Sequence, residues 1–378
     1  MMADLDVIAL TKELLSFNTI NPPGNEAKMA QWMGELFSAH GFEVNLPVYD
    51  KNRLHLVAEK GVRGPEAPLV LSGHFDTVPL GEKLWTRDPF SGTIEGDRIY
   101  GRGSSDMKGG VAAMTVAAIE ATTVSSPKGG IRLIFSAGEE GGCQGVQQLV
   151  STYKGLGEAR AVIVGEPTAN IPAIGHKGAL YMNAVTQGKT AHSSMPELGD
   201  NAIYKAAKCI TGIEAFRFEA ERDRLLGYPS INVGKMQGGM NINSVPDHAE
   251  FTIDIRSTSM IDHKTIIERL IQKLGEDVVL ETLVDLNPVL TRESDPFVQL
   301  VYGVCLTDRQ DDTWSRSLPY LTDGSVLQAF YGGVPCIILG PGEPGMAHQT
   351  DEYCSIEKLK QSVSIYKNII LNRRNENE

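Results

Sequence analysis

Short apolar runs alternate with helical patterns along the first 176 residues of the chain. Three runs of five or six mostly apolar residues have the length and composition of buried strands, namely 69–73, 131–136 and 161–165. Apolar residues spaced three and four apart predict helices at 5–16, 27–40, 107–121 and 145–153. Strands that alternate with helices form a largely parallel sheet with helices on both faces, so we predict an α/β fold.

The pattern changes after residue 176 and returns near residue 295. In between, apolar and polar residues alternate as in half-exposed strands at 180–187, 249–256 and 278–285, and helical spacing occurs at 201–218 and 262–274. The first pattern resumes with a helix, a strand and a helix at 296–306, 334–339 and 356–371. We therefore expect a mixed, largely parallel α/β domain formed by residues 1–176 and 289–378. It is interrupted at 177–288 by an inserted α+β domain, with two helices on a small, mostly antiparallel sheet.

Composition and charge exclude several classes of protein. Of 378 residues, 42% are apolar and 22% charged, which is ordinary for a globular protein. The 35 basic and 47 acidic residues give a net charge of −12, unlike the basic surface that nucleic acid or an anionic membrane would require. No apolar run is long enough to span a bilayer, and acids stand near the N-terminus where a signal peptide carries bases. Five scattered cysteines without a C-x-x-C pair favour a reducing compartment, so we expect a cytoplasmic protein.

Histidines and acids follow the predicted strands of the first domain. These residues are His74 and Asp76, Glu139 and Glu140, Glu166, and His348, with Asp106 just before the helix that starts at 107. The carboxyl ends of parallel strands face one crevice, so we expect these side chains to gather at one edge of the sheet. Each residue alone has an ordinary alternative, such as a solvated turn or a helix N-cap. Four strand ends that all carry such residues favour a metal site.

The types of donor group also indicate which metals would bind and how many ions the site would hold. Imidazole and carboxylate without thiolate suit zinc, cobalt or manganese. Two divalent ions carry four positive charges, which three ligand carboxylates and one bridging hydroxide would balance. Paired ions about 3.5–4 Å apart need a carboxylate that bridges them. The pattern therefore predicts a centre for two metal ions.

Five segments of the chain, in order, resemble the di-zinc aminoacylase and peptidase family. Its members include acetylornithine deacetylase, succinyl-diaminopimelate desuccinylase and carboxypeptidase G. The segments are SGHFDTVP at 72–79, YGRGSSDMKGG at 100–110, AGEEGG at 137–142, GEPT at 165–168 and AHQTDEY at 347–353. The likeness covers nearly the whole chain.

The resemblance implies two Zn²⁺ ions per subunit, with Co²⁺ as a substitute. By motif, His74 and Glu166 would hold one ion, Glu140 and His348 the other, and Asp106 would bridge both. The implied reaction is hydrolysis of an amide bond by an activated water.

Two further residues of the same motifs would complete the chemistry. Asp76 would orient the imidazole of His74 without binding the metal itself. Glu139 would be the general base, which takes a proton from the attacking water and passes it to the leaving amine. The zinc ions would stabilise the oxyanion.

The inserted domain resembles the family's lid, or dimerisation, domain. His192, in the segment TAHSS, looks like the histidine that reaches into the partner subunit's site of a homodimer. Asn243 and Arg256 resemble lid residues that hold the carboxylate of the substrate. Plain alternatives are a surface histidine, a turn residue and a surface ion pair, respectively.

The substrate is less closely defined. Residues 176–178 are His-Lys-Gly where desuccinylases typically show Arg-Arg-Gly, and this favours acetylornithine deacetylase. We therefore expect an enzyme that removes the acyl group from N-acetyl-ornithine or a similar N-acyl-L-amino acid. Alternatives are a desuccinylase, a dipeptidase or carboxypeptidase of the same family and, remotely, a non-catalytic binding protein.

Overall fold

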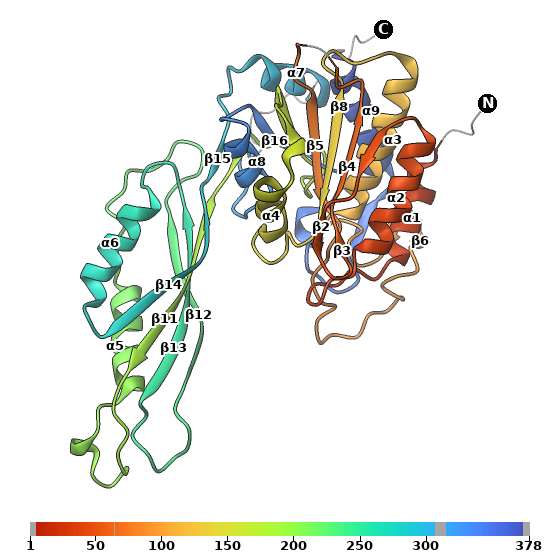
Figure 1. Cartoon of the computed structure of the whole chain (residues 1–378). Helices are drawn as coiled ribbons and strands as arrows, with labels where there is room; N and C mark the ends of the chain where they lie inside the picture. The colour runs from red at the N-terminus through yellow and green to blue at the C-terminus, as the bar shows by residue number, and fades with distance from the viewer. Residues whose placement is uncertain (1–4, 64, 307–314, 373–378) are drawn as a thin grey trace. The chain divides into compact units, whose positions relative to one another are not determined.

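The computed structural model describes residues 5–63, 65–306 and 315–372, which form two compact units (Figure 1). Unit 1 comprises Met1–Gly175, Leu290–Arg316 and Thr322–Glu378, and unit 2 comprises His176–Val289 and Ser317–Leu321. Unit 2 therefore includes a short segment that lies within our predicted 289–378 portion. Among the described residues, no helix has both the length and the apolar character needed to cross a membrane.

A six-stranded, mixed sheet forms the centre of unit 1. Its order is β1 (Glu43–Asn45), β4 (Leu56–Lys60), β8 (Ile131–Ser136), β5 (Leu69–His74), β9 (Ala161–Val164) and β16 (Cys336–Ile338). The last four strands run parallel, whereas β4 is antiparallel to β8 and β1 to β4. Every residue of these four parallel strands is buried, as expected for a sheet covered on both faces.

The helices of unit 1 pack around this sheet. They are α1 (Val7–Ser16), α2 (Ala27–Ala39), α3 (Lys108–Val124), α4 (Gln144–Thr152), α7 (Pro296–Cys305), α8 (Gly324–Phe330) and α9 (Ile356–Ile370). The α3 helix contacts α1, α9 and β5, so it is buried nearly all round and its sequence is rich in alanine rather than amphipathic. The mixed, largely parallel α/β fold predicted from the sequence is confirmed, although α8 was not predicted.

Shorter elements complete unit 1. A three-stranded sheet joins β17 (Tyr353–Ser355), β7 (Arg98–Tyr100) and β6 (Thr93–Glu95), so that the C-terminal region pairs with the loop before α3. Two short hairpin strands, β2 (Val48–Asp50) and β3 (Arg53–Leu54), pair with each other. The two-residue strands β10 (Gly175–His176) and β15 (Val289–Leu290), each of which has one residue in unit 1 and one in unit 2, also pair.

Unit 2 is a four-stranded antiparallel sheet with two helices on one face (Figure 1). The strand order is β12 (Ser230–Gly238), β13 (His248–Ser257), β11 (Gly178–Gln187) and β14 (Val278–Leu286). The helices α5 (Ala202–Glu214) and α6 (His263–Leu274) bury their apolar faces against β11 and β13. Sequence analysis missed β12 because this edge strand is mostly exposed and its residues show little apolar alternation.

Two glycines allow the start of α3 to approach the end of β9. A Cβ atom added to Gly110 would lie 2.3 Å from the carbonyl oxygen of Gly165, which is backbone and has little freedom to move. The amide of Gly165 in turn donates to the carbonyl of Ser72 in β5. This close approach brings Asp106, two residues before α3, and Glu166, two residues after β9, to the same edge of the sheet.

We predict that Gly110→Ala lowers the free energy of unfolding by about 2 kcal/mol or more, because the added methyl overpacks this contact. Gly212→Ala in α5 is the matched control, since its nearest heavy atom would be a leucine methyl at 3.5 Å. That change should stabilise the protein by about 0.5–1 kcal/mol through helix propensity. Urea denaturation of both variants measures the difference. Equal effects of the two substitutions would contradict the proposed close approach.

Candidate metal centre and active site

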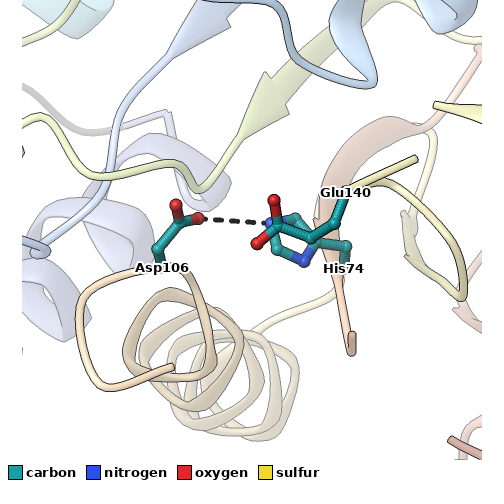
Figure 2. A group of neighbouring side chains, drawn as sticks. All are labelled: His74, Asp106 and Glu140. Atoms are coloured by element: carbon teal, nitrogen blue, oxygen red, sulfur yellow. Dashed lines mark ion pairs between the residues drawn. The ribbon is translucent and has the colours of Figure 1, made fainter. Parts of the chain in front are cut away.

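Loops at the carboxyl edge of the parallel strands carry most of the candidate residues. His74 ends β5, Glu139 and Glu140 follow β8, and Glu166 follows β9. Asp106 precedes α3, and donor atoms of His74, Asp106 and Glu140 all lie within 4.8 Å of one another. Figure 2 shows the three side chains pointing toward a common space. The structure thus brings together residues that are far apart in the chain.

Asp106 stands between the two histidines. Its Oδ1 lies 3.3 Å from Nε2 of His74, and its Oδ2 lies 3.4 Å from Nε2 of His348. Each histidine faces a further acid: Oε1 of Glu166 is 3.6 Å from His74 Nε2, and Oε2 of Glu140 is 3.2 Å from His348 Nε2. The arrangement has two halves, each with one imidazole and one glutamate, and one oxygen of Asp106 turned to each half.

The negative charge of the carboxylates in this cluster is suited to binding cations. Within the described chain, Asp106, Glu140 and Glu166 form ion pairs only with histidine, and Oε1 of Glu140 is buried without a hydrogen-bond partner. Contacts with Asp106 and Glu140 raise the pKa of His348 to about 10. Burial alone would lower the pKa of His74, but Asp106 and Glu166 raise it well above its usual range. Such a carboxylate-rich cluster attracts protons or, equally, metal ions.

Asp76 organises the loop that carries Glu139 and Glu140. Its carboxylate accepts hydrogen bonds from the backbone N–H groups of Gly138, Glu139 and Glu140 at 2.9–3.1 Å. The imidazole Nδ1 of His74 bonds to the backbone carbonyl of Asp76 at 2.9 Å, whereas the Asp76 carboxylate is 3.7 Å away. Residue 76 therefore holds the ring mainly through its main chain, and its side chain holds the neighbouring loop.

A buried ion pair organises the loop that carries Asp106, and sequence analysis gave it no role. Oε2 of Glu352 accepts from Arg102 Nη1 at 2.7 Å and from the Gly103 amide at 3.0 Å. Its Oε1 accepts from the amides of Ser105 and Asp106 at 2.8 and 3.0 Å. Arg102 also donates to a carbonyl in the segment of His348, at Gln349. One ion pair thus ties the loop of Asp106 to the segment of His348.

A second buried cluster lies beside Glu139. Donor atoms of Glu139, Cys143 and Asp323 lie within 4.8 Å of one another, and all three residues are buried. Burial raises the pKa of Glu139 well above its usual range and that of Asp323 to about 6. Asp323 stands nearly 190 residues from Ser136, its hydrogen-bond donor, so no local pattern pointed to it.

The remaining predicted residues, His192, Asn243 and Arg256, belong to unit 2. His192 and Asn243 are neighbours, because the bridge between His192 and Ser244 and the bond from Ser193 N–H to the Asn243 carbonyl join their segments. Asn243 precedes the start of β13, whereas Arg256 stands near its end. At about 3.4 Å per residue, eight residues of strand separate the two ends by about 27 Å. One chain therefore does not bring Asn243 and Arg256 together.

Arg256 is held in place within unit 2. Its Nε lies 2.9 Å from Oδ1 of Asp254, and its guanidinium lies over the ring of Tyr181 at 5.1 Å from the centroid. About a quarter of its side chain is exposed (27%), so Arg256 is not fully enclosed within unit 2.

Comparisons with known proteins agree in placing this chain among metallohydrolases. The sequence model of peptidase family M20/M25/M40 matches residues 70–372. A probable succinyl-diaminopimelate desuccinylase of Staphylococcus epidermidis is 30% identical over 401 residues, covering 97% of this chain and 98% of the relative. An acetylornithine deacetylase of Myxococcus xanthus is 30% identical over 327 residues, covering 81% of this chain and 80% of the relative.

Solved structures share the fold at lower identity. An M20 family metallo-carboxypeptidase from Sulfolobus solfataricus has a TM-score of 0.77 at 21% identity, covering 97% of this chain and 99% of the other. A dinuclear metal binding peptidase of the M20 family from Bacillus subtilis has a TM-score of 0.72 at 15% identity, covering 97% and 96%. At these identities the likeness shows the fold alone, and it is the predicted one.

We predict that Glu352→Gln lowers the free energy of unfolding by about 3–5 kcal/mol, as expected when one partner of a buried ion pair is removed. Each oxygen of Glu352 accepts two hydrogen bonds, so an amide nitrogen in place of either oxygen would face two donors. Glu66→Gln is the matched control, because its pair with Lys128 is 3.2 Å long and exposed. That change should cost less than about 1 kcal/mol in urea denaturation. Similar losses in both variants would show that Glu352 is not a structural anchor.

Proposed function

We propose that this chain, which belongs to peptidase family M20/M25/M40, removes the acyl group from an N-acyl-L-amino acid. Membership of the family makes it a metal-dependent hydrolase of amide bonds with a small-molecule substrate. The observation that carries the proposal is the placement of Asp106 between two histidines, each with its own glutamate, beside a buried Glu139.

The residues that would hold the metals follow from these contacts. We assign His74 and Glu166 to one zinc ion, Glu140 and His348 to the other, and Asp106 to both. Each assigned pair is within 3.6 Å, and the shared acid presents a separate oxygen to each histidine. Cobalt, which accepts the same donors, would substitute. When bound, the two ions act as Lewis acids toward the carbonyl oxygen and lower the pKa of water.

Glu139 is the proposed general base. It follows Glu140 directly, and the amides of both residues are anchored by Asp76, so the two carboxylates keep distinct positions. Burial raises the pKa of Glu139, which favours uptake of a proton from the attacking water. Glu139 then delivers that proton to the amine nitrogen as the amide bond breaks.

Acetyl is the acyl group that we favour. The position where desuccinylases typically carry two arginines holds His176 and Lys177. Burial lowers the pKa of His176 to about 4, so it is neutral at pH 7, and Lys177 Nζ donates to the Tyr228 carbonyl at 2.6 Å. A second carboxylate on the acyl group would therefore meet one cation, Lys177, in place of two arginines, and N-acetyl-ornithine is our first candidate. The desuccinylase alternative is supported by the relative matched over 97% of this chain.

Two copies of the chain would share each active site in a homodimer. Because about 27 Å of β13 separates the ends that carry Asn243 and Arg256, one substrate cannot contact both in a single chain. We assign Arg256 to the substrate carboxylate in its own chain, and Asn243 and His192 to the partner's site. His192 would donate to the oxyanion there. The five free cysteines support a cytoplasmic location.

A hydrolysis screen tests the proposed reaction. We expect N-acetyl-ornithine to be cleaved with the highest kcat/KM among N-acetyl-ornithine, N-succinyl-diaminopimelate, N-acetyl-methionine and several dipeptides, with added zinc or cobalt. Glu139→Gln should lower kcat by at least about 10²–10⁴-fold without loss of bound metal, since only the base is removed. Preference for the succinyl substrate or for dipeptides would overturn our choice of acyl group or of reaction. Loss of one metal in Glu139→Gln would mean that the two glutamates have exchanged roles.

Subunit mixing tests the shared site. Glu139→Gln and His192→Ala should each be nearly inactive, because a lost oxyanion donor costs about 10²–10³-fold in kcat. A mixed dimer contains one site with both groups intact only if His192 acts across the interface, so mixing should restore up to about a quarter of wild-type activity when subunits exchange at random. Absence of recovery, with exchange demonstrated by differently tagged subunits, would place His192 within its own chain's site or outside the chemistry.

A further inference from the structure

Cys143 makes two contacts with the same glutamate. Its thiol Sγ lies 3.3 Å from Oε1 of Glu139, and its backbone N–H donates to the Glu139 carbonyl at 2.7 Å. The side chain of Cys143 is fully buried, and the residue occupies the position before α4. Among the described residues, the other oxygen of Glu139, Oε2, has no hydrogen bond within the chain.

The backbone at Cys143 is in the left-handed region, with φ 57° and ψ 24°. Glycine is favoured in this conformation, because a Cβ atom makes it less stable. Cys143 makes no capping hydrogen bond to α4, so its side chain does not stabilise that helix end. The thiol instead turns toward Glu139, which suggests that the strained position is retained for this contact.

Asp323 also lies close to the thiol, because donor atoms of Glu139, Cys143 and Asp323 are within 4.8 Å of one another. It is the N-cap residue of α8 but makes no capping bond, and its Oδ2 accepts from Ser136 Oγ at 2.5 Å. Its Oδ1 is buried without a hydrogen-bond partner in the described part of the chain. Ser136 ends β8, three residues before Glu139. Asp323 is therefore fixed by the same strand that leads into the catalytic loop.

We propose that Cys143, fixed against Asp323, is a positioning residue that holds Oε1 of Glu139 and leaves Oε2 to meet the attacking water. The inference rests on the proposed role of Glu139 as general base. A carboxylate on a flexible three-carbon side chain samples several rotamers, and a donor to one oxygen selects among them. The thiol is a weak donor, so it orients Glu139 without binding it as firmly as an arginine or lysine would.

Kinetics of three variants test the positioning role. Cys143→Ala removes the donor and should lower kcat about five- to tenfold with KM within about twofold and metal content unchanged. Cys143→Ser restores a donor of similar size and should keep kcat within about threefold of wild type. Cys336→Ala is the matched control, because Cys336 is an equally buried free cysteine in the core strand β16, and its kcat should not change.

Infrared spectroscopy of the holoenzyme tests the contact without any turnover. A hydrogen-bonded thiol absorbs at lower S–H stretching frequency than a free one. The S–H band of Cys143 is identified as the one that disappears in Cys143→Ser, and its frequency should be lower than those of the other cysteines. In Glu139→Gln this band should move to higher frequency, because the amide is a weaker acceptor than the carboxylate. This measurement remains possible if Cys143→Ala fails to fold.

The outcomes separate this inference from the proposed function. Full kcat in Cys143→Ala, equal losses in the alanine and serine variants, or an S–H band that does not respond to Glu139→Gln would each overturn the positioning role. Full kcat in Glu139→Gln would instead refute the general base, and the positioning role would fall with it. A change of preferred substrate in the hydrolysis screen would leave the inference intact, because the variants are compared on whichever amide the wild type cleaves.

Discussion

The constraint on which unit 1 depends is the burial of carboxylates at the carboxyl edge of its sheet. Asp106, Glu139, Glu140 and Glu166 lie there beside two histidines, and in the described chain none of the four pairs with lysine or arginine. Removing an ionised carboxylate from water costs several kcal/mol unless a cation compensates it. Divalent metals in the proposed centre would supply that compensation, so stability and catalysis would have the same requirement.

Two other buried acids, Asp76 and Glu352, keep these carboxylates in place by accepting hydrogen bonds from the backbone of the loops that carry them. Asp76 accepts three backbone N–H groups from the loop that carries Glu139 and Glu140. Glu352 accepts three from the loop that carries Asp106, together with a guanidinium from Arg102. Each loop is thereby fixed through its main chain, and its side chains would be free to bind the metals of the proposed centre.

Sequence alone predicted the parallel strands and the convergence of His74 and Glu166, because both follow runs that are buried on all sides. It did not find the edge strand β12, whose exposed residues give little apolar signal. It also missed Glu352 and Asp323 as organisers, since their partners lie roughly 190–250 residues away and only the strand order brings them together. The separation of Asn243 from Arg256 likewise required the register of β13, which no spacing along the chain supplies.

Metal binding by the purified chain tests the central claim most directly. After removal of metal with a chelator, equilibrium dialysis against zinc followed by elemental analysis should give two zinc ions per chain. Asp106→Asn should bind less than one at the same free zinc concentration, because that residue faces both halves of the centre. One ion or none in the wild type, or two ions retained by Asp106→Asn, would contradict a centre bridged by Asp106.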